Sequence, residues 1–143
     1  MKSATIDLQQ LFDSLTKHVL SCKSAHFVLN RHASFESWFR VELVPVLQGL
    51  GYSEDQIQTD YTFPGSRNKA DLYVRADGDL VFELKPFVKG QDSRKKERYP
   101  RQIKNLENIV ESGQCQQVIA LTTFVGYTKE NMQNLYFISN IEL

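Results

Sequence analysis

A continuous apolar stretch, residues 118–124 (Val-Ile-Ala-Leu-Thr-Thr-Phe), constrains the fold more than any other feature of the chain. An unbroken run of this kind is typical of a strand that is covered on both faces of its sheet. The preceding segment predicts a helix, because Pro100 suits a first helical turn and Gly113 suits a helix end. The apolar stripe of this helix consists of Ile103, Leu106 and Val110. Since a helix between two strands of one sheet usually connects parallel neighbours, the sequence predicts a parallel pair here.

Three shorter segments upstream have the alternation of half-buried strands. Apolar and polar residues alternate from Ile57 to Phe63, ahead of a Pro64-Gly65-Ser66 turn. Segments 70–76 and 80–87 flank the sequence Asp77-Gly78-Asp79, which is a hairpin signal. We therefore expect an antiparallel meander of three strands before the crossover helix.

The N-terminal part of the chain predicts a helix and then a loop. Residues 8–19 place apolar side chains three or four apart, with Ser3 or Thr5 as a candidate N-cap. Residues 21–33 are polar, so we expect them to form a loop.

A second helix is expected from a Ser34 cap to about Leu50, with Pro45 removing one backbone hydrogen bond inside it. After the apolar strand, residues 126–143 predict a short helix and an edge strand at 135–139. The order helix, helix, strand, strand, strand, helix, strand predicts an α/β fold with one mixed sheet and helices on its faces.

Composition places the chain among ordinary globular domains. A length of 143 residues suits a single domain spanning 1–143, and 41 % hydrophobic residues suffice for a core. No apolar run approaches the ~18 residues that span a bilayer, and residues 1–10 lack a signal-peptide pattern. Cys22 and Cys115 have no metal-ligand spacing and suit a reducing compartment. We therefore expect a cytoplasmic protein with no membrane partner.

The strand Val81-Phe82-Glu83-Leu84-Lys85 holds the strongest candidates for chemistry. Glu83 and Lys85 are two apart, so both side chains leave one face of the sheet, with Cα atoms ~6.6 Å apart. Burying either charge alone is costly, so each needs the other, a cation or water. The alternative is a strand whose polar face is merely solvated, but Val81 and Phe87 share that face and argue against full exposure.

Asp71 opens the preceding strand and reaches the same face only in certain registers. In an antiparallel hairpin, opposed residues share a face, so the numbers of paired residues must sum to an even number. A two-residue loop would pair 76 with 79 and put Asp71 on the wrong face. A three-residue loop at 77–79, or an equivalent bulge, pairs 76 with 80 and 71 with 85. We therefore predict the longer loop and a shared site.

The chemistry of this site indicates a divalent cation. Carboxylates of Asp71 and Glu83, with a strand carbonyl such as that of Leu84, form an all-oxygen pocket of the kind that Mg²⁺ prefers. Such an ion polarises a phosphodiester and lowers the pKa of a bound water. Lys85 could orient that water or offset charge that develops on the phosphate.

Asp71 followed by Glu83-x-Lys85, in this order of elements, resembles the PD-(D/E)XK nuclease superfamily, which has the restriction-endonuclease-like fold. The resemblance covers about residues 34–124. It implies an α-β-β-β-α-β core to which the N-terminal helix is extra, and Mg²⁺-dependent hydrolysis, with Mn²⁺ as a substitute. It also implies a catalytic, metal-ligating Glu42 on the helix before the sheet, with Glu36 as the fallback, and a catalytic Gln102 on the helix after the Glu-x-Lys strand. Ala70 stands where the name-giving Pro would be, a substitution that the superfamily tolerates.

Local charge suggests how a nucleic acid could be held, although the formal net charge of the chain is zero. The segment from 89 to 104 has seven basic residues against two acidic ones, a net charge of +5. Such a patch attracts phosphates. The expected contacts are Lys89, Arg94, Lys95, Lys96, Arg98 and Arg101, with Arg67 and Lys69 from the loop before Asp71. A solvated helix start is the plain alternative.

The sequence thus predicts a DNA endonuclease, but it leaves open the substrate, the catalytic activity and the source of specificity. RNA is an alternative substrate, because no RNA-specific module is present. A catalytically silent nucleic-acid-binding or complex-assembly module on the same fold is an alternative function. A chain of this size has no separate recognition domain, so we expect a homodimer or a partner protein to supply specificity.

Overall fold

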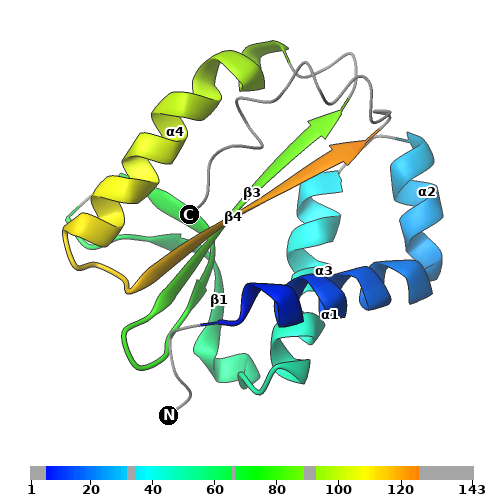
Figure 1. The fold of residues 1–143 in the computed structure, drawn as a ribbon, viewed down its shortest axis with the longest axis horizontal. Helices are drawn as coiled ribbons and strands as arrows, with labels where there is room; N and C mark the ends of the chain where they lie inside the picture. The colour runs from blue at the N-terminus through cyan, green and yellow to red at the C-terminus, as the bar shows by residue number, and fades with distance from the viewer. Residues whose placement is uncertain (1–5, 32–34, 66, 89–92, 126–143) are drawn as a thin grey trace.

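The described chain forms an α/β fold around one mixed four-stranded sheet (Figure 1). The computed structural model describes residues 6–31, 35–65, 67–88 and 93–125, and only the backbone of some residues inside helices and strands. Its elements, in chain order, are α1 (Leu8–Ser21), α2 (Lys23–Arg31), α3 (Phe35–Gly49), a 3₁₀ turn η1 (Glu54–Gln56), β1 (Ile57–Thr62), β2 (Lys69–Val74), β3 (Leu80–Val88), α4 (Ser93–Glu111) and β4 (Gln117–Val125).

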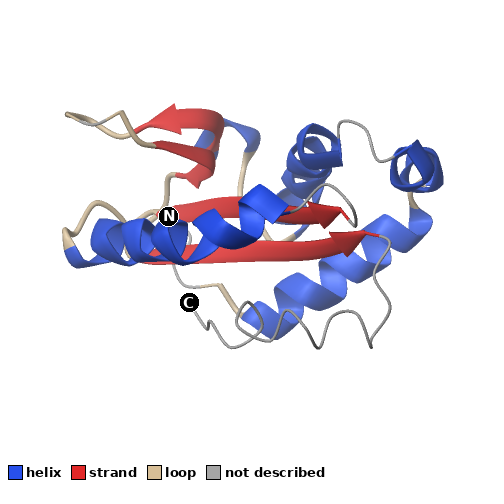
Figure 2. Cartoon of the chain, turned by 90° about the horizontal axis from the view of Figure 1, so that it is seen from above, coloured by secondary structure: helices blue, strands red, loops and turns tan. Residues whose placement is uncertain are grey.

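The sheet has the strand order β1-β2-β3-β4. The pairs β1–β2 and β2–β3 are antiparallel, and β3–β4 is parallel, from Leu80 opposite Gln117 to Val88 opposite Val125. Helix α4 connects the parallel strands, as the sequence predicted. Figure 2 shows the short β1–β2 hairpin turned away from the long β3–β4 pair. The expected meander and crossover are therefore both confirmed.

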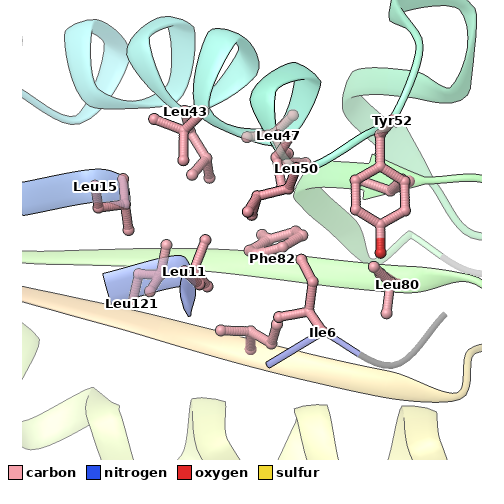
Figure 3. Packing of buried hydrophobic residues seen from close by; sticks show 14 of the residues in the cluster. Ile6, Leu11, Leu15, Leu43, Leu47, Leu50, Tyr52, Leu80, Phe82 and Leu121 are labelled. Atoms are coloured by element: carbon pink, nitrogen blue, oxygen red, sulfur yellow. The ribbon is translucent and has the colours of Figure 1, made fainter. Parts of the chain in front are cut away.

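Two apolar clusters hold helices against the sheet. On one face, α1 and α3 cover Phe82 and Leu84 of β3 (Figure 3). On the other face, α4 covers Val81 through Ile103, Leu106 and Ile109. Alternate residues of β3 therefore face different helices, and the side chains that share the face of Val81 look toward α4.

The N-terminal helices differ from the prediction in two ways. Helix α1 is capped by Asp7, whose Oδ1 accepts a hydrogen bond from the Gln10 N–H at 2.8 Å, and not by Ser3 or Thr5. Residues expected to form a loop form α2, where Ala25 is buried and Val28 packs against the core. Tertiary contacts stabilise this helix, since nine residues are too few for an isolated helix to be stable in water.

Helices α3 and α4 each contain a proline. Pro45 lies inside α3, as predicted, but Pro100 also lies inside α4, because that helix begins earlier, at Ser93. The charged residues before Pro100 form no apolar stripe, so the sequence did not indicate their helical state. The Ser34 cap and the elements expected in 126–143 lie outside the described residues. No helix in the described ranges is long and apolar enough to cross a lipid bilayer.

The connection between β2 and β3 sets the register of the site. Val74 lies opposite Leu80 and Leu72 opposite Phe82, so the paired numbers sum to an even number, as predicted. The predicted pairing of 76 with 80 is wrong by two residues, because Leu80 pairs with Val74 and the connection is five residues long, 75–79. The side chain of Asp79 stabilises this longer loop, accepting hydrogen bonds from the Ala76 N–H at 2.9 Å and from the Tyr73 hydroxyl.

Gly78 joins this loop to the start of β4. Its carbonyl accepts a hydrogen bond from the Gln116 N–H at 2.6 Å. Gly78 has a φ of +102°, and a Cβ there would lie 2.1 Å from Gln116 Oε1. The backbone conformation therefore favours glycine, and any larger residue would also have to displace the Gln116 side chain.

Candidate active site

Three charged side chains from β2 and β3 meet on the α4 face of the sheet. Lys85 Nζ lies 3.7 Å from Glu83 Oε2, and the side chains are only 19 % and 12 % exposed respectively. Continuing the observed register by one residue sets Asp71 opposite Glu83, where the prediction had set it opposite Lys85. The expected cluster of Asp71, Glu83 and Lys85 is therefore present, with the two carboxylates as closest strand neighbours.

The Asp71 carboxylate occupies the place where β2 leaves β3. Its Oδ2 accepts a hydrogen bond from the Leu84 N–H at 2.7 Å. The paired residues of these strands end at Leu72 and Phe82, so this side chain replaces a backbone partner for Leu84. The bond fixes the direction of the Asp71 carboxylate and holds it beside Glu83.

Burial raises the pKa of Glu83 from 4.5 to about 8. The negative charge of Asp71 adds to this effect, and so does a hydrogen bond between the two side chains, whereas Lys85 partly offsets it. With both carboxyls ionised, the pair would carry more negative charge than its one ammonium neighbour neutralises, which is why Glu83 holds its proton. An arrangement of this kind suits a group that supplies positive charge.

We expect the metal-free protein to lose stability as pH rises from about 5 to about 9. Because the folded-state pKa of Glu83 is raised, the folded chain holds a proton that the unfolded chain has released above pH 4.5. The stability is full below that value and is lost as pH rises through about 8. In the presence of EDTA, the melting temperature should fall by on the order of 5 °C over this window.

Glu83→Gln is the control for this pH dependence, because it keeps the shape of the side chain and removes the titration. Its melting temperature should fall less than that of the native chain over the same pH window. Equal slopes in the two proteins would show that Glu83 titrates normally.

A pocket of about 220 Å³ opens over the carboxylate and ammonium groups. Glu83 and Lys85 line it from β3, and Gln102 lines it from α4. The pocket is completed by Asn68, Lys69, Asn105, Leu106 and Ile109. Glu83, Lys85 and Gln102, which the sequence predicted as site residues, thus line one pocket. Asp71 is connected to this pocket through its interaction with Glu83.

The helix carboxylates are placed elsewhere. Glu42 Oε2 lies 2.5 Å from His18 Nε2, which joins α3 to the last turn of α1. Glu36 lies 4.0 Å from Arg40, which also pairs with Asp60 at 2.7 Å. The structure therefore does not bring Glu42 or Glu36 to the pair, because α3 packs on the opposite face of the sheet from α4.

Two carboxylates are the acidic groups available for a metal ion. Among the described residues, no group of three His, Cys, Asp or Glu side chains is placed to hold one. Mg²⁺ commonly uses one or two carboxylates and completes its shell with water and substrate phosphate. Asp71 and Glu83 fit that requirement, and the Leu84 backbone lies beside Asp71.

The predicted phosphate-binding residues fall into two groups. Lys69 lines the pocket. Arg67, two residues before Lys69, is exposed, and so are Arg98 and Arg101, which precede the pocket residue Gln102 on α4. The backbones of Arg94, Lys95 and Lys96 lie in the first turns of α4, while their side chains and Lys89 lie outside what the structure describes. Sequence reasoning missed Asn105, which the three-residue spacing from Gln102 along one helix face could have indicated.

Comparisons with protein-family models, with curated proteins and with solved structures gave no match to this chain.

Proposed function

We propose that this chain is a metal-dependent phosphodiesterase that cleaves DNA, with a fold of the restriction-endonuclease-like type. The observation that supports it best is that Glu83 and Lys85 share one pocket with Gln102, and that Asp71 interacts with Glu83 beside that pocket. The element order and the antiparallel meander followed by a parallel strand agree with this type of core.

Each site residue has a proposed role that follows from its charge. Asp71 and Glu83 would hold Mg²⁺, and the ion would supply a Lewis acid for the scissile phosphate. The raised pKa of Glu83 supports this fit, because a divalent cation would relieve the repulsion between the two carboxylates. The ammonium of Lys85, 3.7 Å from Glu83, would offset negative charge that develops on the phosphate. Gln102 would orient a water through its amide.

Positive side chains near the pocket would hold the backbone of the substrate. Lys69 is in the pocket itself, so it would contact the phosphate next to the scissile bond. Arg98 and Arg101 are exposed on the first half of α4 and would follow the strand beyond it. Binding should therefore weaken as the salt concentration rises.

A catalytically silent binding module is the second candidate. The position of Glu42 favours it, because the acidic residue that the superfamily commonly adds to the site is paired with His18 here. Such a module would bind DNA through the same basic residues without hydrolysing it.

Nicking of supercoiled plasmid separates these functions. We expect the native chain to produce open-circular DNA with Mg²⁺ or Mn²⁺ and none with EDTA. A matched RNA incubated under the same conditions tests the choice of sugar, and faster cleavage of RNA would overturn the DNA assignment. Retardation of the plasmid without any nicking would favour the silent module.

A further inference from the structure

The catalytic pocket continues into a second pocket of about 170 Å³ along α4. The two share Asn68, Asn105 and Ile109 as lining residues, so they are parts of one depression. The polar lining of the second pocket, which we call the amide groove, consists of Asn68, Asn105, Asn108, Ser112 and Gln114.

The amide groove follows one stripe of α4. Gln102, Asn105 and Ser112 are spaced so that they lie along the flank of the buried apolar stripe. From Gln102 to Ser112 the helix rises about 15 Å, which corresponds to roughly four base steps of duplex DNA. The bases of nucleotides next to a phosphate at Glu83 and Lys85 could therefore lie along this groove.

The chemistry of the amide groove favours a neutral ligand over phosphate. All its polar lining residues are amides or hydroxyls, without an ionisable group. It lies at the C-terminal half of α4, where the helix dipole is negative and repels anions. Glu107 and Glu111 outnumber Lys104 on the same helix half and add to that repulsion. Arg98 and Arg101 are on the opposite half, so the two halves suit different parts of a nucleotide.

Asn108 and Asn105 are free to bind such a ligand. Both are exposed, and within the described part of the chain neither side chain makes a hydrogen bond. Ser112 donates its hydroxyl proton to the Ile109 carbonyl at 2.8 Å, which leaves its oxygen as an acceptor. Amides offer a donor and an acceptor together, which is the pattern that base edges match.

We infer that the amide groove receives the edge of a nucleobase next to the scissile phosphate, so that cleavage depends on the base at that position. This inference rests on the proposed nuclease function. It assigns Asn105 and Asn108 as specificity residues, distinct from the carboxylates that act on the phosphate.

Cleavage of a DNA library with randomised positions around the cut tests the inference. The native chain should prefer particular bases at one or two positions beside the cut, and Asn108→Ala should reduce that preference by about tenfold. Gln48→Ala, an exposed amide on α3, is the matched control and should keep the native profile. A native chain without base preference, or an unchanged profile in Asn108→Ala, would overturn the inference while leaving the nuclease in place.

A binding experiment applies if the native chain does not cleave. The side-chain amide resonances of Asn105 and Asn108 should shift when a 12-base-pair DNA duplex is added in EDTA, and inorganic phosphate alone should leave them unmoved. Shifts without cleavage would keep the groove and reject the nuclease. No shift, or the same shift with phosphate, would reject the groove as a base site.

Discussion

Glu83→Gln and Lys85→Met are each expected to lower the rate of plasmid nicking by about 10³-fold or more. Glu83→Gln preserves the shape of the side chain and removes the charge that would hold the cation beside Asp71. Lys85→Met removes the ammonium that lies 3.7 Å from Glu83 and leaves two partly buried carboxylates without their positive neighbour. Initial rates on supercoiled plasmid, at equal protein and metal concentrations, measure both effects.

Two substitutions of the same chemistry serve as controls. Glu107→Gln changes an exposed residue of α4 that lines a different pocket, and Lys17→Met changes an exposed residue of α1. Both variants should nick within about threefold of the native rate. Retained nicking in Glu83→Gln, with a melting curve that shows a folded protein, would mean that the reaction takes place elsewhere.

Phe82→Ala is expected to destabilise the fold by about 4 kcal/mol. Phe82 is fully buried on the central part of β3, opposite Leu72 on β2 and Ile119 on β4. Figure 3 shows its ring beneath Leu47 of α3 and Leu50, which follows that helix. Removal of the ring leaves a cavity among three elements whose backbones are tied by the sheet and cannot close around it.

Chemical denaturation of Phe82→Ala beside Phe12→Ala measures this effect. Phe12 is 52 % exposed on α1, so its loss should change the free energy of unfolding by less than about 1 kcal/mol. Similar losses in the two variants would show that the cluster on the α3 face does not hold the sheet in place.

The strands were predictable because local periodicity decides them. The alternation from Ile57 to Phe63 and the unbroken run at 118–124 each correspond to a strand, within one residue at most ends. Residues 21–33 predict a loop, but Lys23–Arg31 is helical, because its helical state depends on distant contacts such as the hydrogen bond from Trp38 Nε1 to Ser24 Oγ. A residue pattern within one segment does not contain that information.

The site was predictable to the level of a shared face. If Asp71, Glu83 and Lys85 share a face, the numbers of paired residues on β2 and β3 must sum to an even number. The observed register meets this condition. The two-residue shift in register depends on Asp79, whose side chain holds a longer loop by hydrogen bonds from Ala76 and Tyr73. That choice depends on side-chain geometry that residue spacing does not give.

The position of Glu42 could not be foreseen from its own helix. Its spacing along α3 suits either a site residue or a surface partner, and the outcome depends on how α1 packs across α3. His18 reaches it from the last turn of α1, in a helix that the resemblance treats as an addition to the core. The extra helix therefore changes the environment of a residue that the core alone would leave available.

Thermal unfolding of the native chain at about pH 8, with and without Mg²⁺ or Mn²⁺, tests most directly whether Asp71 and Glu83 form a cation site. Either metal should raise the melting temperature by about 3 °C or more, and Glu83→Gln should lose this rise. A native melting temperature that is unchanged by both metals would contradict the cation site.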